Sequence, residues 1–178
     1  MPHIHTLPGQ YDLTVSAYII RTDGPEPKIV MHKHKILGKY LQFGGHVELN
    51  EDPWQAVVHE TLEESGYQMS QLKLLQPDIP QAKVSFGVIH PHSVATISVQ
   101  FGDTDHNHTD IAYAFTANSP PNKPLGKNES SEIKLFTRQE LAALSDEQIP
   151  VNAREIGLYI FDECLPHWKA VDTAIFSE

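Results

Sequence analysis

Residues 43–67, FGGHVELNEDPWQAVVHETLEESGY, contain the local signals that decide the surrounding fold. A glycine pair leads into a short loop. Asp52 then suits the N-cap of a helix, Pro53 its first position, and Gln55 the third position of a capping box. Gly66 stands where a left-handed residue commonly ends a helix. These signals predict a helix that begins at Pro53 and ends just before Gly66.

The predicted helix has two different faces at about 100° per residue. One face is apolar, is expected to pack against a core, and carries Trp54, Val57, Val58, Thr61 and Leu62. The other face carries Glu60, Glu63 and Glu64, although like charges at this spacing cost roughly 0.2–0.5 kcal/mol per pair. Most Glu-rich faces are simply solvated. Here the glycine pair and the further acids Glu48 and Glu51 favour a bound metal ion instead.

The stretch resembles the Nudix box, GX5EX7REUXEEXGU, in which U is a bulky aliphatic residue. The fixed positions of the box fall without a gap on Gly45, Glu51, Glu60, Glu63, Glu64 and Gly66. The match, at residues 45–67, departs from the pattern at three places. His59 stands where the family usually has Arg, and Thr61 and Tyr67 occupy aliphatic positions. The resemblance is specific for the family and carries no information about the substrate.

The resemblance implies an α/β fold, a Nudix-type α/β/α sandwich with a mixed β-sheet. It also implies a metal-dependent pyrophosphohydrolase that uses Mg²⁺ or Mn²⁺. Such an enzyme cleaves the phosphoanhydride of a nucleoside diphosphate linked to another moiety, as in a nucleoside triphosphate or a nucleotide sugar. The alternative is a Nudix-fold nucleotide-binding module with little or no turnover, because His59 cannot reproduce the fork that Arg offers a carboxylate.

The resemblance also assigns roles by position within the box. Glu60, Glu63 and Glu64 match the metal-binding and catalytic glutamates of the family, and Glu60 could instead orient or deprotonate the attacking water. The carbonyl of Gly44 is a further candidate ligand. Glu51 joins the candidate catalytic residues, with a structural role at the loop-to-helix junction as the favoured interpretation.

Many family members take one more acidic ligand from outside the box. The candidates are Glu129 and Glu132, followed by Asp105 and Asp110. Glu132 is favoured because it leads directly into a predicted strand. An exposed loop carboxylate without a ligand remains the alternative for each of them.

Three residues outside the acidic set are candidates for substrate binding. Lys39 precedes the glycine pair and is expected to attract phosphate. Phe43 and Tyr113 are candidates to stack on a base, and core packing is the ordinary alternative for such aromatic residues.

Histidines are numerous and form His-X-His pairs at positions 3/5, 32/34, 90/92 and 106/108. Such pairs can bind zinc, but a structural zinc site needs four ligands and usually includes Cys. The favoured interpretation is therefore solvated residues in loops and at strand ends. The pair at 106/108, just before a predicted strand, could also line a substrate pocket.

The rest of the chain predicts strands around this helix. They are expected at residues 11–21, 28–32, 71–75, 110–116 and 133–136, with further β-like runs at 84–89 and 95–101. Residues 118–131 lack an apolar period and predict a surface loop. Helices are expected from Thr137 to Leu144 and from Asn152 to Leu165, where Pro166 should stop the second. No repeat or linker divides the chain, so residues 1–178 are expected to form a single domain.

Composition limits the function classes. The chain has 178 residues, a net charge of −10 and one Cys, at position 164. The charge excludes a basic footprint for long nucleic acids, and the single Cys excludes an internal disulfide and favours a reducing compartment. Neither a signal peptide nor a run of about 18–20 apolar residues is visible. We expect a cytoplasmic protein with a small nucleotide-type substrate and no membrane partner. The resemblance leaves a homodimer open, since many relatives are dimers.

Overall fold

The computed structural model describes residues 7, 9–77, 91–101 and 104–176; for residues 99–101, 104 and 105 it describes only the backbone. The strands are β1 (Tyr11–Arg21), β2 (Lys28–Lys33), β3 (Tyr40–Leu41), β4 (Phe43–His46), β5 (Leu72–Gln76), β6 (Ser93–Phe101), β7 (Thr104–Ala117), β8 (Ile133–Thr137) and β9 (Lys169–Asp172). Within these ranges they form one sheet in the order β3-β2-β1-β7-β5-β9. Off this path, β4 pairs with β1, β6 with β7, and β8 with β2.

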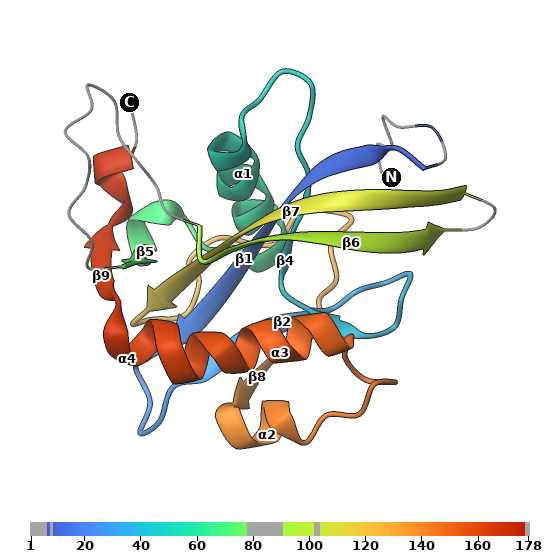
Figure 1. Ribbon diagram of the computed structural model, residues 1–178. Coiled ribbons are helices and arrows are strands. Elements are labelled where there is room, and N and C mark those ends of the chain that lie inside the picture. The colour runs from blue at the N-terminus through green and yellow to red at the C-terminus, as the bar shows by residue number, and fades with distance from the viewer. Residues whose placement is uncertain (1–6, 8, 78–90, 102–103, 177–178) are drawn as a thin grey trace.

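Helices cover both faces of the sheet. Figure 1 shows α1 (Pro53–Ser65) on one face and α3 (Val151–Tyr159) on the other, with α2 (Arg138–Ala142) beyond β8. Parallel pairing of β1 with β7 sits among antiparallel pairs, so the sheet is mixed. This arrangement confirms the predicted α/β/α sandwich. The single-domain assignment stays a prediction.

The two cores follow from the alternation of side chains along β1. Val15 and Ile19 belong to the core between the sheet and α1. Tyr18 and Ile20 belong to the core between the sheet and α3, which also contains Ala153 of that helix. Residues of β1 with even numbers therefore face away from α1, and this division decides which polar residues can meet.

The start and end of α1 confirm the capping signals. The Asp52 carboxylate accepts hydrogen bonds from the backbone N–H groups of Trp54 and Gln55, and the Gln55 side chain accepts one from the Asp52 N–H. Gly66 ends the helix with φ of 73°, in the left-handed region. Local sequence is sufficient to fix these boundaries.

The orientation of α1 differs from the prediction at its C-terminal half. Leu62, assigned to the core face, is 38% exposed, whereas Glu64 is 9% exposed. The buried stripe continues through Thr61 to Glu64 and Ser65. Glu64 therefore lies against the protein, whereas Glu60 is half-buried and Glu63 is exposed.

The C-terminal segment also differs from the prediction. After α3 the helix continues through a π-helical turn, η2 (Ile160–Cys164), into α4 (Leu165–His167). Pro166 therefore lies within the last turn and does not stop the helix before it. The sequence does not predict the edge strand β9. Only Val171 among its residues is partly buried, so the strand has little apolar pattern. The predicted run at 84–89 lies outside the described residues.

Several other sequence predictions are confirmed. Thr137 caps α2, and β1, β2, β5 and β8 lie within a few residues of their predicted positions.

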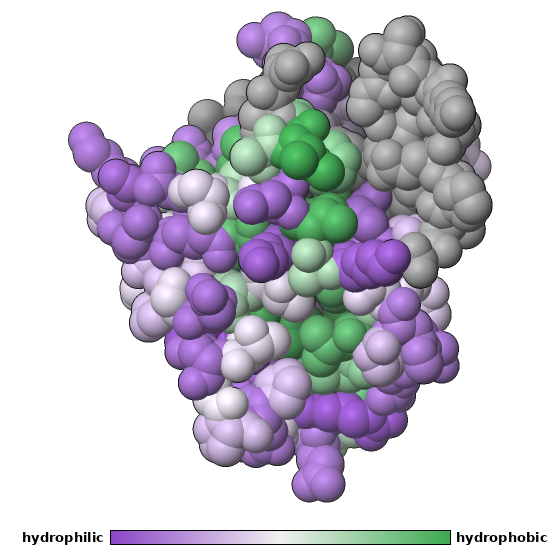
Figure 2. Space-filling view, turned by 90° about the vertical axis from the view of Figure 1, so that its left-hand side faces the viewer, coloured by the Kyte–Doolittle hydropathy of each residue, from purple (hydrophilic) through white to green (hydrophobic). Residues whose placement is uncertain are grey.

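The side of the molecule near β9 is drawn in Figure 2, where hydrophobic residues lie between hydrophilic flanks. No helix of the described chain is long and apolar enough to cross a membrane.

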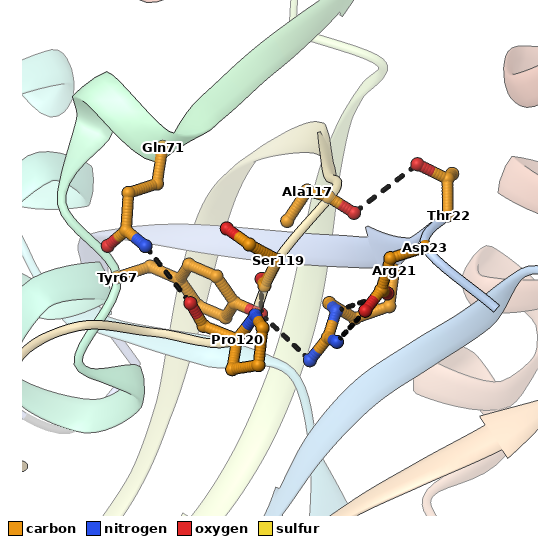
Figure 3. Close-up of polar contacts among 8 residues, drawn as sticks. All are labelled: Arg21, Thr22, Asp23, Tyr67, Gln71, Ala117, Ser119 and Pro120. Atoms are coloured by element: carbon orange, nitrogen blue, oxygen red, sulfur yellow. Dashed lines mark hydrogen bonds and ion pairs between the residues drawn. The ribbon is translucent and has the colours of Figure 1, made fainter.

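The chain between β7 and β8 is the surface loop that the sequence predicts, and it is attached to the end of α1. The Tyr67 hydroxyl donates to the Ser119 carbonyl at 2.9 Å, and the Gln71 amide donates to the Pro120 carbonyl at 3.0 Å. Figure 3 shows both side chains directed at this backbone. These anchors place the loop beside the acidic end of the helix.

Candidate active site

The glycine pair on β4 lies directly against two of the box glutamates. The backbone N–H of Gly44 donates a 2.8 Å hydrogen bond to Glu64 Oε2. Gly44 has φ of 139°, and a Cβ at this residue would collide with the Val15 carbonyl of β1. A Cβ at Gly45 would overlap the Glu60 carboxylate, with its Cδ only 2.7 Å away. Gly44 is therefore needed for β4 to lie close to β1, and Gly45 for β4 to lie close to the Glu60 carboxylate.

His59 connects the loop before the helix to the box. Its Nδ1 lies 2.8 Å from Glu51 Oε2, and its Nε2 lies 3.4 Å from Glu60 Oε1. Glu51 in turn accepts a 2.8 Å hydrogen bond from the Glu48 N–H. An imidazolium donates from both ring nitrogens, so the residue at the usual Arg position can contact two carboxylates. His59 thus contacts two carboxylates, although it cannot offer one of them the fork of an Arg.

Glu129, one of the candidate acids from outside the box, lies near the box glutamates. The Gly126 N–H donates to the Glu63 carbonyl at 2.7 Å, and the Glu129 N–H donates to the Gly126 carbonyl at 3.0 Å. This turn brings the Glu129 charge close enough to raise the pKa of both Glu60 and Glu64. No local sequence pattern indicates this placement of Glu129, because it depends on a backbone contact between a loop and a helix end.

Glu132, the favoured candidate, has other partners. Its carboxylate accepts a 3.0 Å hydrogen bond from the Tyr40 hydroxyl and lies 3.4 Å from the Lys33 ammonium. Glu132 therefore has partners other than the box glutamates, and its assignment as the acidic ligand from outside the box stays a prediction. Asp110 is also occupied elsewhere, since it accepts hydrogen bonds from Thr14 and Ser16.

Burial and mutual repulsion disfavour negative charge in the cluster. Burial, followed by the nearby charges of Glu60, Glu129 and Glu63, raises the pKa of Glu64 to about 8, against the lowering effect of the Gly44 N–H. Burial is also the main reason that the pKa of Glu60 is raised. His32 lies 3.9 Å from Glu64, but burial lowers its pKa to about 4, so it does not supply a positive charge.

This donor set suits a hard divalent cation. Its side-chain donors are carboxylate oxygens, which Mg²⁺ and Mn²⁺ prefer, and its excess negative charge is what a dication would offset. Glu60, Glu63, Glu64 and Glu129 could hold such an ion. The Gly44 carbonyl remains a predicted ligand.

Two of the predicted substrate-binding residues are buried in the core. Phe43 is fully buried and Tyr113 is 6% exposed, and both belong to the core below α1. The Tyr113 ring packs edge-on against Trp54 of the helix. Their placement leaves no open ring face for a base, which corrects the stacking prediction. The Lys39 ammonium donates to the Asp146 carbonyl at 2.7 Å.

Residues 10–156 match the NUDIX domain family, so the chain belongs to the Nudix family and is a hydrolase of that class. Its fold is similar to a NUDIX-family hydrolase from Clostridium perfringens, with 26% identity, a TM-score of 0.65, and coverage of 85% of this chain and 96% of that chain. A C. elegans Ap4A hydrolase in a binary complex gives 18% identity, a TM-score of 0.61, and coverage of 87% and 98%.

A third similar structure is the NUDIX domain of Shewanella oneidensis NrtR with ADP ribose. It has 12% identity and a TM-score of 0.52, covering 83% of this chain and 84% of that chain. Below about 25% identity such likeness speaks for the fold alone. Among curated proteins, none matches this chain.

Proposed function

We propose that this Nudix hydrolase is a metal-dependent pyrophosphohydrolase that cleaves the phosphoanhydride of a small nucleotide derivative. The observation that carries the proposal is the close approach of Glu60 and Glu64 to the glycine pair of β4, with the charge of Glu129 near enough to raise the pKa of both. Buried carboxylates that repel one another are costly to the fold, and a bound dication would offset that cost.

The role of the protein's own residues would be to hold the carboxylate oxygens in place. Glu64, held by the Gly44 N–H, and Glu60, held against Gly45, present oxygens whose positions are fixed by backbone contacts. His59 orients Glu60 from the side of Glu51. The cation, when bound, would neutralise phosphate charge and lower the pKa of the attacking water. We assign the position of general base to Glu60, because its contact with His59 fixes the direction of its carboxylate.

The proposal is tested by product release from a panel of nucleoside triphosphates, nucleotide sugars, ADP-ribose and dinucleoside polyphosphates, with Mg²⁺ or Mn²⁺. We expect one group of substrates to be cleaved and turnover to fall by about 10²-fold or more in Glu63→Gln, which loses a proposed ligand. Silence across the whole panel by a folded protein would contradict the proposal. Ligand-induced thermal stabilisation without products would support the nucleotide-binding module instead.

A matched pair of variants separates the two acids outside the box. Glu129→Gln should raise the Mg²⁺ concentration needed for half-maximal activity by about 10-fold or more, because Glu129 acts on the same carboxylates. Glu132→Gln loses only contacts to Tyr40 and Lys33 and should leave that concentration nearly unchanged. A larger rise in that concentration for Glu132→Gln than for Glu129→Gln would instead identify Glu132 as the metal ligand.

The same proposal extends to the identity of the ion, the location of the protein and its oligomeric state. We infer Mg²⁺ or Mn²⁺ as the ion because the donors are oxygens. A cytoplasmic location is supported by the lone buried Cys164. A homodimer is compatible with the family, and sedimentation of the purified chain would decide between monomer and dimer.

A further inference from the structure

A second group of metal-binding side chains lies at the other end of β4, on the sheet face away from α1. It consists of His46 on β4 and His106 and His108 on β7, each offering one ring nitrogen, and these nitrogens all lie within 4.8 Å of one another. Strand pairing brings them together, because β4 and β7 flank β1 on opposite sides. These three residues are called the His cluster below.

A carboxylate completes the group. Asp12 of β1 is paired with His108 in the register of β1 and β7, and its Oδ2 lies 3.4 Å from His46 Nε2. Asp12 is 5% exposed, and Oδ2 accepts no hydrogen bond from the described residues. A buried carboxylate oxygen of this kind lacks the donors that normally compensate for the loss of water.

The imidazoles are in a form that can bind a cation. Nε2 of His106 and Nε2 of His108 are 2.9 Å apart, so at least one of the two nitrogens must carry a lone pair. A ring nitrogen with a free lone pair is what a metal ligand requires.

We propose that His46, His106, His108 and Asp12 form a binding site for a Zn²⁺-class transition-metal ion, distinct from the carboxylate site. Tetrahedral zinc binds nitrogen at about 2.0–2.1 Å and carboxylate oxygen at about 2.0–2.2 Å, which places neighbouring ligand atoms roughly 3.3 Å apart. The measured separations of 2.9 and 3.4 Å lie on either side of that value. Small side-chain rotations would bring the atoms into place.

Ligand type separates this site from the one on α1. Three imidazoles with one carboxylate select zinc and other late transition metals, whereas Mg²⁺ prefers sites built from oxygen. The ion would join three adjacent strands. Because His46 follows the Gly44-Gly45 pair in β4, it would also fix the strand that holds Glu64.

The test uses full-length protein without a polyhistidine tag, freed of metal and titrated with Zn²⁺ against a coloured chelator in excess Mg²⁺. We expect one tightly bound Zn²⁺ per chain and a rise in the unfolding temperature. Loss of one ligand in His108→Gln should weaken binding by at least about 10–100-fold, since even the loss of an outer partner costs that much. Circular dichroism would establish that the variant is folded.

Three control variants separate other sources of zinc binding. His167→Gln changes an exposed histidine, the double variant His3→Gln/His5→Gln removes the N-terminal pair, and Glu64→Gln alters the carboxylate site. All three should keep the wild-type affinity. Loss of tight binding in any of them but not in His108→Gln would overturn the proposal, as would equal affinity in wild type and His108→Gln.

Cobalt gives a readout that does not depend on any variant folding. Co²⁺ bound by three nitrogens and one oxygen in tetrahedral geometry gives intense visible bands, whereas six oxygen ligands give weak ones. We expect the intense bands at one equivalent of Co²⁺ and their loss when Zn²⁺ is added. Only weak bands, or bands unchanged by Zn²⁺, would refute the site.

Discussion

Tyr67 provides a direct test of how the loop after β7 is held. Its ring is 1% exposed, and its hydroxyl donates to the Ser119 carbonyl at 2.9 Å and receives a longer contact, 3.4 Å, from Arg21. Tyr67→Phe removes the hydroxyl and keeps the ring in the core (Figure 3). The change therefore isolates one polar anchor of the loop.

The expected loss follows from those contacts. A neutral hydrogen bond contributes about 0.5–1.5 kcal/mol net, and half-buried Ser119 can recover part of its loss from water. Arg21 keeps its pairing with Asp23, so the 3.4 Å contact adds little. We expect the free energy of unfolding to fall by about 1 kcal/mol, which for a chain of this size lowers Tm by roughly 2–4 °C.

Urea unfolding followed by circular dichroism measures this loss, with the slope against urea unchanged. Tyr11→Phe is the matched control, because Tyr11 is 61% exposed at the start of β1. It should change stability by less than about 0.5 kcal/mol. Wild-type stability in Tyr67→Phe, or an equal loss in Tyr11→Phe, would show that the hydroxyl does not anchor the loop.

Two further predictions concern the glycine pair and Glu64. Gly44→Ala should destabilise the protein by more than about 3 kcal/mol in urea unfolding, because the new Cβ would collide with the Val15 carbonyl and φ is 139°. Gly24→Ala, whose Cβ would have an ordinary contact at 3.6 Å, should stay within about 1 kcal/mol of wild type, and equal losses would refute the steric argument. The pKa of Glu64 is raised from 4.5 to about 8, so the folded state binds its proton more tightly than the unfolded state. In the presence of a metal chelator, the contribution of Glu64 to the free energy of unfolding should therefore be largest below pH 4.5. This contribution should be lost as the pH rises to about 8. Thermal unfolding of Glu64→Gln across that pH range should lack this pH-dependent contribution. A dependence of Tm on pH equal to that of the wild type would contradict the raised pKa of Glu64.

Local signals account for the parts of the site that the sequence predicts. The capping residues of α1 and the spacing of its glutamates act within one helix, so one stretch of sequence determines both. The position of Glu129 depends instead on the hydrogen bond from Gly126 to the Glu63 carbonyl, far away in the chain. Nothing in the loop sequence specifies that contact. The same limit applies to the His cluster, because His46 is remote in sequence from the pair at 106/108 and meets it only through the register of β1 with β4 and β7.

The rotation of α1 explains why hydrophobic patterning misplaced its faces. A pattern of apolar residues puts Leu62 inside and the glutamates outside, which is the arrangement that favours stability. In the structure Leu62 is exposed and Glu64 is buried against Gly44, at a cost that the raised pKa of Glu64 expresses. A helix that exposes Leu62 and buries Glu64 needs an interaction that offsets this cost, and the Gly44 N–H supplies only one hydrogen bond. A divalent cation at the carboxylates would supply the rest, so the misplaced face is itself an argument for metal binding.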